Sequence, residues 1–261
     1  MARSTALPAS AWLVGASSGI GEALARALAQ QGCHVVISAR RIDACDRIAT
    51  DHPGNIHVVP LDVTDPEACL EAADRVDALL GGAPELVVFA AGVYQLVSAQ
   101  HFESDVFRRL NAVNYLGAVN LLAAVLPPCV ARRKGHIAVV ASVAGYRGLP
   151  RAAAYGATKA ALINLCESLA PELGEHGVRL RLVNPGFVAT PMTAANDFPM
   201  PFLLSAEDAA ERLLTALTGS SRFEITFPKR FTWWLKVLRL APYAGFIPVM
   251  RWMARRRKRS G

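Results

Sequence analysis

Residues 11–38 read AWLVGASSGIGEALARALAQQGCHVVIS, and this stretch decides the fold. The apolar run 11–14 leads into a glycine-rich turn, after which apolar side chains recur at helical spacing until Gly32. A second apolar run, residues 34–38, has the composition of a buried strand. The pattern predicts a β-turn-α-β unit.

The same alternation continues along the chain. Apolar runs predict strands at 56–61, 86–90, 136–141 and 179–183, and helical patterns fall at 66–80, 107–130 and 155–175. Continuously apolar strands spaced by helices indicate a parallel sheet that is covered on both faces. We therefore predict one doubly wound α/β domain over residues 1–222, followed by a C-terminal amphipathic helical extension over 223–261.

Composition excludes several classes of protein. With 261 residues, 52% of them hydrophobic and 19% charged, the chain is too apolar to be disordered. The five scattered cysteines show no C-x-x-C motif and are expected to be buried thiols in a reducing compartment. The six histidines show no metal-ligand spacing, so no metal is expected. Without a signal-peptide core or a run of 18 apolar residues, we expect a cytoplasmic protein.

The net charge of +7 is unevenly distributed. Residues 1–222 hold 18 Lys and Arg against 20 Asp and Glu, a balance of −2, whereas residues 223–261 hold 10 against 1, a balance of +9. The extension also contains eight of the 19 aromatic residues. A near-neutral body offers no basic groove, so no nucleic-acid partner is expected.

Three glycines, Gly15, Gly19 and Gly21, lie between the first strand and the first helix. Glycine permits a tight turn and a close backbone approach, and the N-terminus of the helix offers unpaired N–H groups to a pyrophosphate. Glycines at such a turn can also serve packing alone. Their position in a β-α-β unit favours dinucleotide binding.

The end of the second strand indicates which dinucleotide is bound. It reads Ser38-Ala39-Arg40-Arg41, with no acid before Asp43. An acid there would bind the ribose of NAD, whereas an arginine binds a 2′-phosphate through charge-assisted hydrogen bonds. The alternative is an ordinary solvated basic turn. We predict NADP(H), held by Arg40.

Tyr155 and Lys159 lie four residues apart, on one face of a predicted helix. A nearby ammonium favours the phenolate and so lowers the pKa of a tyrosine toward neutrality. Ser142 directly follows the strand 136–141, at the edge where α/β proteins bind ligands. Each residue alone is unremarkable, but the three together after a glycine loop indicate acid–base catalysis.

At this point the sequence closely resembles the short-chain dehydrogenase/reductase family, which has a Rossmann-type fold. The resemblance covers residues 10 to about 220. Arg40 indicates the NADP-preferring form of the family, whose chains have about 250 residues. The matching motifs are Gly15, Gly19 and Gly21; Asp62-Val63; Asn114-Tyr115-Leu116-Gly117; Ser142; Tyr155 with Lys159; and Asn184-Pro185-Gly186.

The resemblance implies hydride transfer between a nicotinamide and a carbonyl or alcohol carbon. Tyr155 would be the general acid or base, and Ser142 would hold the substrate oxygen. Lys159 would bind the nicotinamide ribose and lower the pKa of Tyr155, and Asn114 would hold a water that links Lys159 to solvent.

The resemblance also implies a set of cofactor contacts, in which Thr190 would bind the carboxamide. The set is Gly15, Ser17, Ser18, Gly19, Ile20, Gly21, Arg40, Asp62, Val63, Ala91, Gly92, Asn114, Tyr155, Lys159, Pro185, Gly186, Val188 and Thr190. Two positions depart from the family pattern: Val14 replaces the usual Thr, and Ala90 replaces the Asn of N-A-G. These departures put local rigidity in question, not the chemistry.

A proline-rich, apolar segment after Gly186 predicts a lid over the crevice. Residues 187–203 contain no Lys or Arg, which favours a hydrophobic ketone or aldehyde over a phosphorylated or small acidic substrate. The alternative is that these residues form core or dimer contacts. The residues predicted to line the substrate pocket are Val93, Tyr94, Tyr146, Leu149, Phe187 and Met192.

Residues 231–259 combine an amphipathic segment with a basic cluster at 255–259. Short amphipathic helices with tryptophan and basic residues bind membrane interfaces, so we predict peripheral contact with an anionic membrane, on the inner face. The alternative is that the apolar side packs on the body or on a second subunit. The resemblance further implies a homodimer formed through helices 107–130 and 155–175.

Three functions stay open at this stage. The leading one is an NADPH-dependent oxidoreductase of a lipid-like or cyclic ketone or aldehyde, or the corresponding alcohol. The second is a soluble alcohol dehydrogenase of small substrates, with the extension capping the pocket. The third is a non-enzymatic NADP-sensing or scaffold protein, which the intact set Asn114, Ser142, Tyr155 and Lys159 disfavours.

Overall fold

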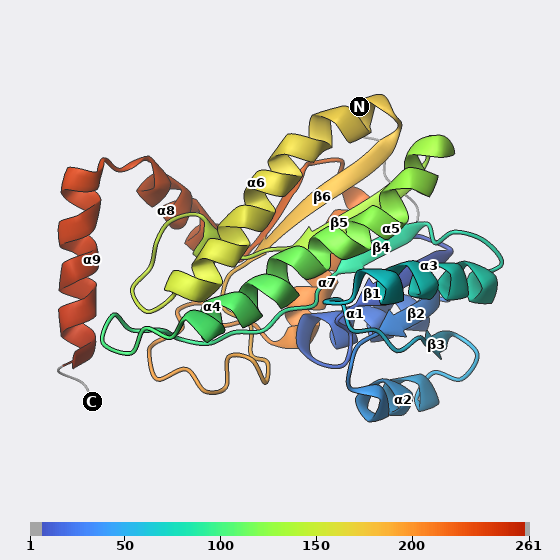
Figure 1. Cartoon of the computed structure of the whole chain (residues 1–261), viewed down its shortest axis with the longest axis horizontal. Coiled ribbons are helices and arrows are strands. Elements are labelled where there is room, and N and C mark those ends of the chain that lie inside the picture. Colours follow the sequence, from blue (N-terminus) through green and yellow to red (C-terminus); the bar gives the residue numbers. More distant parts are fainter. Residues whose placement is uncertain (1–6, 259–261) are drawn as a thin grey trace.

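The computed structural model describes the backbone of residues 7–258 and the side chains of residues 7–254. Seven parallel strands form one sheet in the order β3-β2-β1-β4-β5-β6-β7 (Figure 1). The strands are β1 (Ser10–Val14), β2 (His34–Ser38), β3 (Ile56–Val58), β4 (Leu86–Phe89), β5 (Gly135–Val140), β6 (Val178–Pro185) and β7 (Glu224–Phe227).

Helices cover both faces of the sheet. They are α1 (Gly19–Gln30), α2 (Ile42–Thr50), α3 (Pro66–Leu80), α4 (Ser104–Asn111), the π-helical η1 (Ala112–Leu116), α5 (Gly117–Ala131), the 3₁₀ turn η2 (Val143–Gly145), α6 (Ala153–Glu175), α7 (Ala206–Gly219), α8 (Lys229–Leu240) and α9 (Tyr243–Lys258). Buried residues form one core beneath α3, α5 and α6 and another beneath α1, α2 and α7. The predicted doubly wound fold is confirmed.

Alternation along β1 shows why a continuously apolar strand suits this fold. Trp12 and Val14 belong to the first core, whereas Ala11 and Leu13 belong to the second. Successive side chains of a strand point to opposite faces, so a strand between two helical layers needs apolar residues at every position. The predicted burial of the cysteines is also confirmed, since all five are buried free thiols.

Helices α4, η1 and α5 run on as a single helix, Ser104–Ala131. It contains an 18-residue window of mean hydropathy 1.6, so by length and composition it passes as a membrane span. Half of that window is buried inside the protein, where α5 packs on α3 and on the sheet. Its hydropathy therefore reflects a core helix of the fold.

In the structure, the boundary between the α/β domain and the C-terminal extension lies later in the chain than the predicted residue 222. Strand β7 pairs in register with β6, Leu182 opposite Glu224 and Pro185 opposite Phe227, so residues 224–227 belong to the sheet. The extension outside the sheet begins at Lys229, and residues 229–261 hold 10 Lys and Arg and no Asp or Glu. Its last helix, α9, stands at the left edge of Figure 1, away from the sheet. The predicted boundary at residue 222 missed this strand because its apolar residues are few.

Candidate active site

The glycine loop between β1 and α1 packs directly against the segment that follows β4. Gly15 has a φ of +93°, and a Cβ there would lie 2.2 Å from the backbone nitrogen of Ala91. A Cβ on Gly21 would lie 2.5 Å from the carbonyl oxygen of Gly15. Neither position accepts a side chain, so the loop keeps bare backbone beside the N-terminus of α1, as a pyrophosphate requires.

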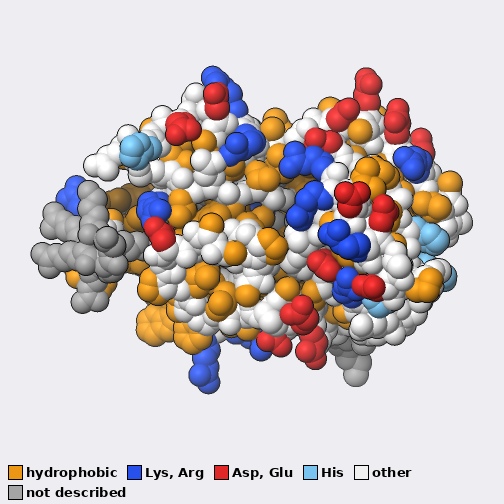
Figure 2. Space-filling view, turned by 90° about the horizontal axis from the view of Figure 1, so that it is seen from below, with side chains coloured by type: hydrophobic (Ala, Val, Ile, Leu, Met, Phe, Trp, Pro, Cys, Tyr) orange, Lys and Arg blue, Asp and Glu red, His pale blue; other side chains and the backbone are white. Residues whose placement is uncertain are grey.

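The loop forms one wall of a cavity of about 580 Å³ at the carboxyl ends of the strands. Figure 2 views the molecule from this side, with hydrophobic side chains around the recessed middle of the face. Sixteen of the predicted cofactor residues line the cavity: Gly15, Ser17, Ser18, Gly19, Ile20, Gly21, Arg40, Val63, Ala91, Gly92, Tyr155, Lys159, Pro185, Gly186, Val188 and Thr190. Across the cavity mouth, a Cβ on Gly19 would lie 2.9 Å from the Thr190 side chain.

Arg41, which the sequence analysis did not select, reaches the glycine loop. Its Nη2 donates to the hydroxyls of Ser17 at 3.0 Å and Ser18 at 2.8 Å. The side chain of Arg40 is 60% exposed and lies 4.0 Å from the Asp62 carboxylate. Both arginines line the cavity, but Arg41 is the one fixed against the phosphate loop. The signal was present in the sequence as a second consecutive arginine.

Asp62 itself lies beside the cavity wall, which Val63 forms. Burial acts to raise the pKa of Asp62, but hydrogen bonds from the backbone and hydroxyl of Thr64, together with Arg40, lower it overall. The carboxylate is therefore ionised at neutral pH. It orders the turn before α3 through its hydrogen bonds with Thr64.

The three predicted catalytic side chains lie together in the cavity. Ser142 follows β5, and the first turns of α6 carry Tyr155 and Lys159. The Ser142 hydroxyl hydrogen-bonds the Tyr155 phenol, and the Lys159 ammonium lies 5.6 Å from the centre of the Tyr155 ring. The arrangement places two hydrogen-bonded hydroxyls in the cavity with an ammonium near the phenol ring.

The protonation energetics differ from what the resemblance implied. Burial raises the pKa of Tyr155 to about 12, although the Ser142 hydrogen bond opposes this and Tyr94 adds to it. Burial lowers the pKa of Lys159 to about 8, and its Nζ donates to the carbonyl of Val140 at 2.9 Å. The expected lowering of the Tyr155 pKa by Lys159 is not seen in the protein alone, because the ammonium is itself desolvated and directed at a carbonyl. Tyr155 is thus a protonated acid at neutral pH.

Asn114 lies on the π-helical turn η1, completely buried beneath the cavity floor. Its Oδ1 accepts from the Val93 backbone at 2.7 Å, and its Nδ2 donates to the Val93 carbonyl and the Thr158 hydroxyl, both at 3.0 Å. A π-turn often marks a functional position in a helix. Here it lets one amide join the loop after β4 to α6, next to Lys159.

The predicted substrate residues divide into two groups. Val93, Tyr94 and Met192 line the cavity, and the Tyr94 ring packs edge-on against Tyr155 with centroids 4.9 Å apart. The other three are not among the residues that line the cavity: Tyr146, Leu149 and Phe187.

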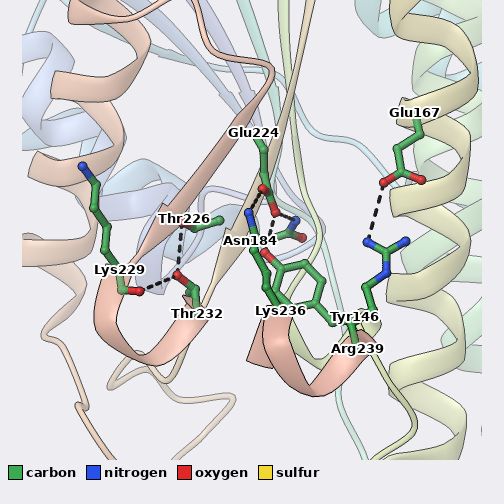
Figure 3. A network of polar contacts seen from close by, with 9 residues as sticks. All are labelled: Tyr146, Glu167, Asn184, Glu224, Thr226, Lys229, Thr232, Lys236 and Arg239. Carbon is green, nitrogen blue, oxygen red and sulfur yellow. Dashed lines mark hydrogen bonds and ion pairs between the residues drawn. The ribbon is translucent and has the colours of Figure 1, made fainter. Parts of the chain in front are cut away.

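The turn η2 explains the position of Tyr146. It directs this ring toward the β6–β7 edge, where the hydroxyl donates to Glu224 (Figure 3). Phe187 instead packs between Phe198 of the predicted lid and Phe231 of α8, at centroid distances of 6.0 and 5.6 Å. Neither ring therefore lines this cavity, in contrast to the prediction from sequence.

The residues present fit a phosphate-bearing dinucleotide. Two glycines whose Cβ atoms would strike backbone, the N-terminus of α1 and two arginines lie at one end of the cavity. Ser142, Tyr155 and Lys159 lie in the same cavity, and apolar side chains complete its wall. Among the described residues, no group of three or more His, Cys, Asp or Glu side chains could hold a metal ion.

Comparison with known proteins agrees with this geometry. The family model described as short chain dehydrogenase matches residues 9–198. An uncharacterized oxidoreductase of Myxococcus xanthus is 39% identical over 221 residues, which cover 84% of this chain and 87% of the relative. A dehydrogenase/reductase SDR family protein 7-like of Anopheles gambiae is 32% identical, over 90% of this chain and 80% of its own.

Solved structures show the same fold. A short-chain dehydrogenase from Streptomyces avermitilis superposes with a TM-score of 0.80 and 25% identity, over 94% of this chain and 97% of that one. A short-chain dehydrogenase from Burkholderia cenocepacia, solved in complex with NADP, gives a TM-score of 0.80 at 24% identity, over 93% and 97% of the two chains. The chain belongs to the short-chain dehydrogenase/reductase family and is an NAD(P)-dependent oxidoreductase.

Proposed function

We propose that this enzyme prefers NADPH and interconverts a hydrophobic ketone or aldehyde with its alcohol. The observation that carries the proposal is that one cavity joins the glycine loop and two arginines to Ser142, Tyr155 and Lys159. The bound cofactor supplies hydride exchange with the substrate carbon. The protein supplies binding, orientation and the proton.

In this proposal Tyr155 protonates the substrate oxygen during reduction and removes the proton during oxidation. The pKa of about 12 keeps the phenol protonated at neutral pH, which suits an acid in the reductive direction. Ser142 donates a second hydrogen bond to the same oxygen and stabilises its developing charge. Lys159, with a pKa of about 8, can carry a positive charge beneath Tyr155 and favour return of the proton.

The preference for NADPH rests on charge. Arg40 and Arg41 follow β2, and both line the cavity at its phosphate end. An arginine pair attracts a 2′-phosphate through charge-assisted hydrogen bonds. The apolar preference rests on Val93, Tyr94 and Met192, which face the catalytic group.

Two measurements test the proposal. The full-length enzyme is assayed with NADPH and NADH against a set of long-chain and cyclic ketones, and greater activity with NADH would contradict the cofactor preference. Replacing Tyr155 with Phe is expected to lower kcat by at least about 10²–10⁴-fold, with NADPH affinity retained. A variant that keeps wild-type turnover would show that another group is the acid.

One observation favours a second candidate, a dehydrogenase of small alcohols whose pocket is capped by the extension. Phe231 of α8 packs on Phe187 and on Phe202 of the lid, with centroids 5.6 and 6.1 Å apart. The same substrate set separates the candidates, since kcat/KM that falls as the alkyl chain lengthens would favour the small-alcohol enzyme.

We also propose, from the family resemblance, that the protein is a homodimer through α5 and α6. Light scattering on the full-length protein tests this, and a monomeric mass at working concentrations would contradict it.

A further inference from the structure

Polar contacts of three α8 residues hold this helix to the protein body. Thr232 is only 2% exposed, and its hydroxyl donates to the hydroxyl of Thr226 on β7 at 3.2 Å. One turn further along, Lys236 forms an ion pair with Glu224, and Arg239 lies 3.8 Å from Glu167 of α6 (Figure 3). Three polar residues of α8 thus have partners on the body, and the apolar Phe231 and Leu235 of the same helix pack against the core.

Arg147 fixes the junction between α8 and α9. Its guanidinium donates to the carbonyls of Arg239 and Ala241, both at 3.0 Å. It also lies over the rings of Tyr243 and Phe246, at 4.6 and 4.5 Å from their centres. A single side chain therefore supplies hydrogen bonds to the carbonyl groups at the C-terminus of α8 and contacts the first turn of α9.

Other apolar side chains of α8 are exposed. Trp233 and Trp234 are 60% and 66% exposed, and Leu240 is 84% exposed. Helix α9 continues the surface with further large, exposed apolar side chains. Together we call these residues the apolar tail surface: Trp233, Trp234, Val237, Leu240, Tyr243, Ile247, Val249 and Trp252. Large apolar side chains exposed in such number on two neighbouring segments indicate an interaction site.

The charge around this surface has one sign. Residues 229–261 hold 10 Lys and Arg and no carboxylate side chain, and Lys229, Arg230 and Arg251 are exposed. The side chains of the basic cluster at 255–259 lie outside the described residues. An all-basic tail repels a second copy of itself, whereas it complements an anionic surface.

We propose that the apolar tail surface binds the interface of an anionic lipid bilayer. Exposed tryptophans and tyrosine suit the headgroup region, and each basic residue near an anionic bilayer adds about 1 kcal/mol of attraction. Helices α8 and α9 contain 12 and 16 residues, too few to cross a membrane, so the contact is peripheral.

The binding surface adjoins the lid of the active site. Phe231 lies on the same helix as the two tryptophans and packs on Phe187 and Phe202, of which Phe202 is itself 55% exposed. A bilayer in contact with α8 would therefore lie next to the segment that borders the cavity. This consequence rests on the proposed apolar substrate, whereas lipid binding itself does not.

Vesicle flotation of the full-length protein tests the proposal. The protein is mixed with phosphatidylcholine vesicles, with or without about one third phosphatidylglycerol, and floated through a density gradient. We expect flotation with the anionic vesicles and little with the neutral ones, and a blue shift of tryptophan emission on binding. Because Trp12 is buried, such a shift reports the three tail tryptophans.

The decisive variant replaces three exposed residues, Trp233→Ser, Trp234→Ser and Leu240→Ser, and is expected to lower binding at least about tenfold. The matched control, Leu70→Ser with Leu79→Ser, changes exposed apolar residues of α3 and should float like wild type. Equal binding by the triple variant, or no flotation of the wild type, would overturn the proposal. If the wild type does not float and the triple variant dissociates a dimer in light scattering, the surface is instead a subunit interface. Neither result depends on the enzyme's substrate, so lipid binding can fail without refuting the proposed function.

Discussion

The Tyr146 hydroxyl donates a hydrogen bond to the Glu224 carboxylate, which joins the turn after Ser142 to the edge strand of the sheet. Asn184 Nδ2 donates to the same carboxylate at 2.8 Å, and Lys236 of α8 forms an ion pair with it (Figure 3). Asn184 directly precedes the Pro185-Gly186 segment of the cavity wall. One carboxylate therefore connects two active-site segments with the C-terminal extension.

Replacing Glu224 with Gln should destabilise the protein. Burial acts to raise the pKa of Glu224, but hydrogen bonds from Lys236, Tyr146 and Asn184 lower it overall. A lowered pKa means that the ionised carboxylate stabilises the fold above its unfolded pKa, and this stability is lost as pH falls through the folded value. We expect Glu224→Gln to lose about 1–3 kcal/mol of unfolding free energy at pH 7, and less below pH ~4, by urea denaturation.

Glu167→Gln is the matched control for that measurement. Glu167 forms a 3.8 Å pair with Arg239 in which both side chains are nearly half exposed. Exposed pairs contribute little, so this change should cost at most about 1 kcal/mol. Equal losses of unfolding free energy in the two variants would show that the Glu224 contacts stabilise the protein no more than an exposed ion pair does.

Replacing Gly15 with Ala should disrupt the loop itself. The new Cβ would lie 2.2 Å from the Ala91 backbone at a φ of +93°, so either the turn or the segment after β4 must move. We expect a loss above about 3 kcal/mol by thermal denaturation, or no soluble protein. Gly54→Ala has a similar φ of +83° with no neighbour within 4 Å, and should cost only about 1 kcal/mol. Comparable losses of stability in the two variants would mean that backbone strain at positive φ, and not the close approach of the Ala91 backbone, causes the effect at Gly15.

Arg41→Ala should reduce NADPH binding more than Arg40→Ala does. Arg41 is fixed by two serine hydroxyls of the glycine loop, whereas Arg40 is mostly exposed. Losing charge-assisted contacts to a phosphate is expected to weaken NADPH about 10–100-fold, with a smaller effect on NADH. Calorimetric titration of both cofactors into both variants measures this. A larger loss in Arg40→Ala would restore the assignment made from sequence.

The burial of Lys159 predicts a dependence of stability on pH. Its pKa of about 8 lies below the ordinary 10.5, so between these values the unfolded chain holds a proton that the folded protein does not. The stability contributed by this group therefore rises with pH across that window. Relative to Lys159→Met, the wild type should gain unfolding free energy between pH 7 and 9.5, measured by urea denaturation. Parallel pH profiles for the two proteins would contradict the lowered pKa.

The sequence predicted the parallel, doubly wound sheet of the body and most of the site because those features are local. Apolar runs reported strands, and the glycine loop, Ser142, Tyr155 and Lys159 each followed from spacing or from position at a strand end. Arg41 was missed because adjacent arginines are equivalent in sequence, and only their directions in space distinguish them. Tyr146 was predicted to line the substrate pocket. The direction of its side chain depends on the backbone geometry of the preceding turn η2, which the residue types alone do not give.

From the sequence we predicted that residues 231–240 form an amphipathic segment and that the basic excess lies in the extension. Only the tertiary structure decided which side of that segment the body engages. Glu224 and Thr226 of β7 and Glu167 of α6 come from two distant places in the chain, and together they offer polar partners to Thr232, Lys236 and Arg239. These contacts, together with Phe231 and Leu235 packed on the core, leave the two tryptophans exposed, and no periodicity within the helix encodes that choice.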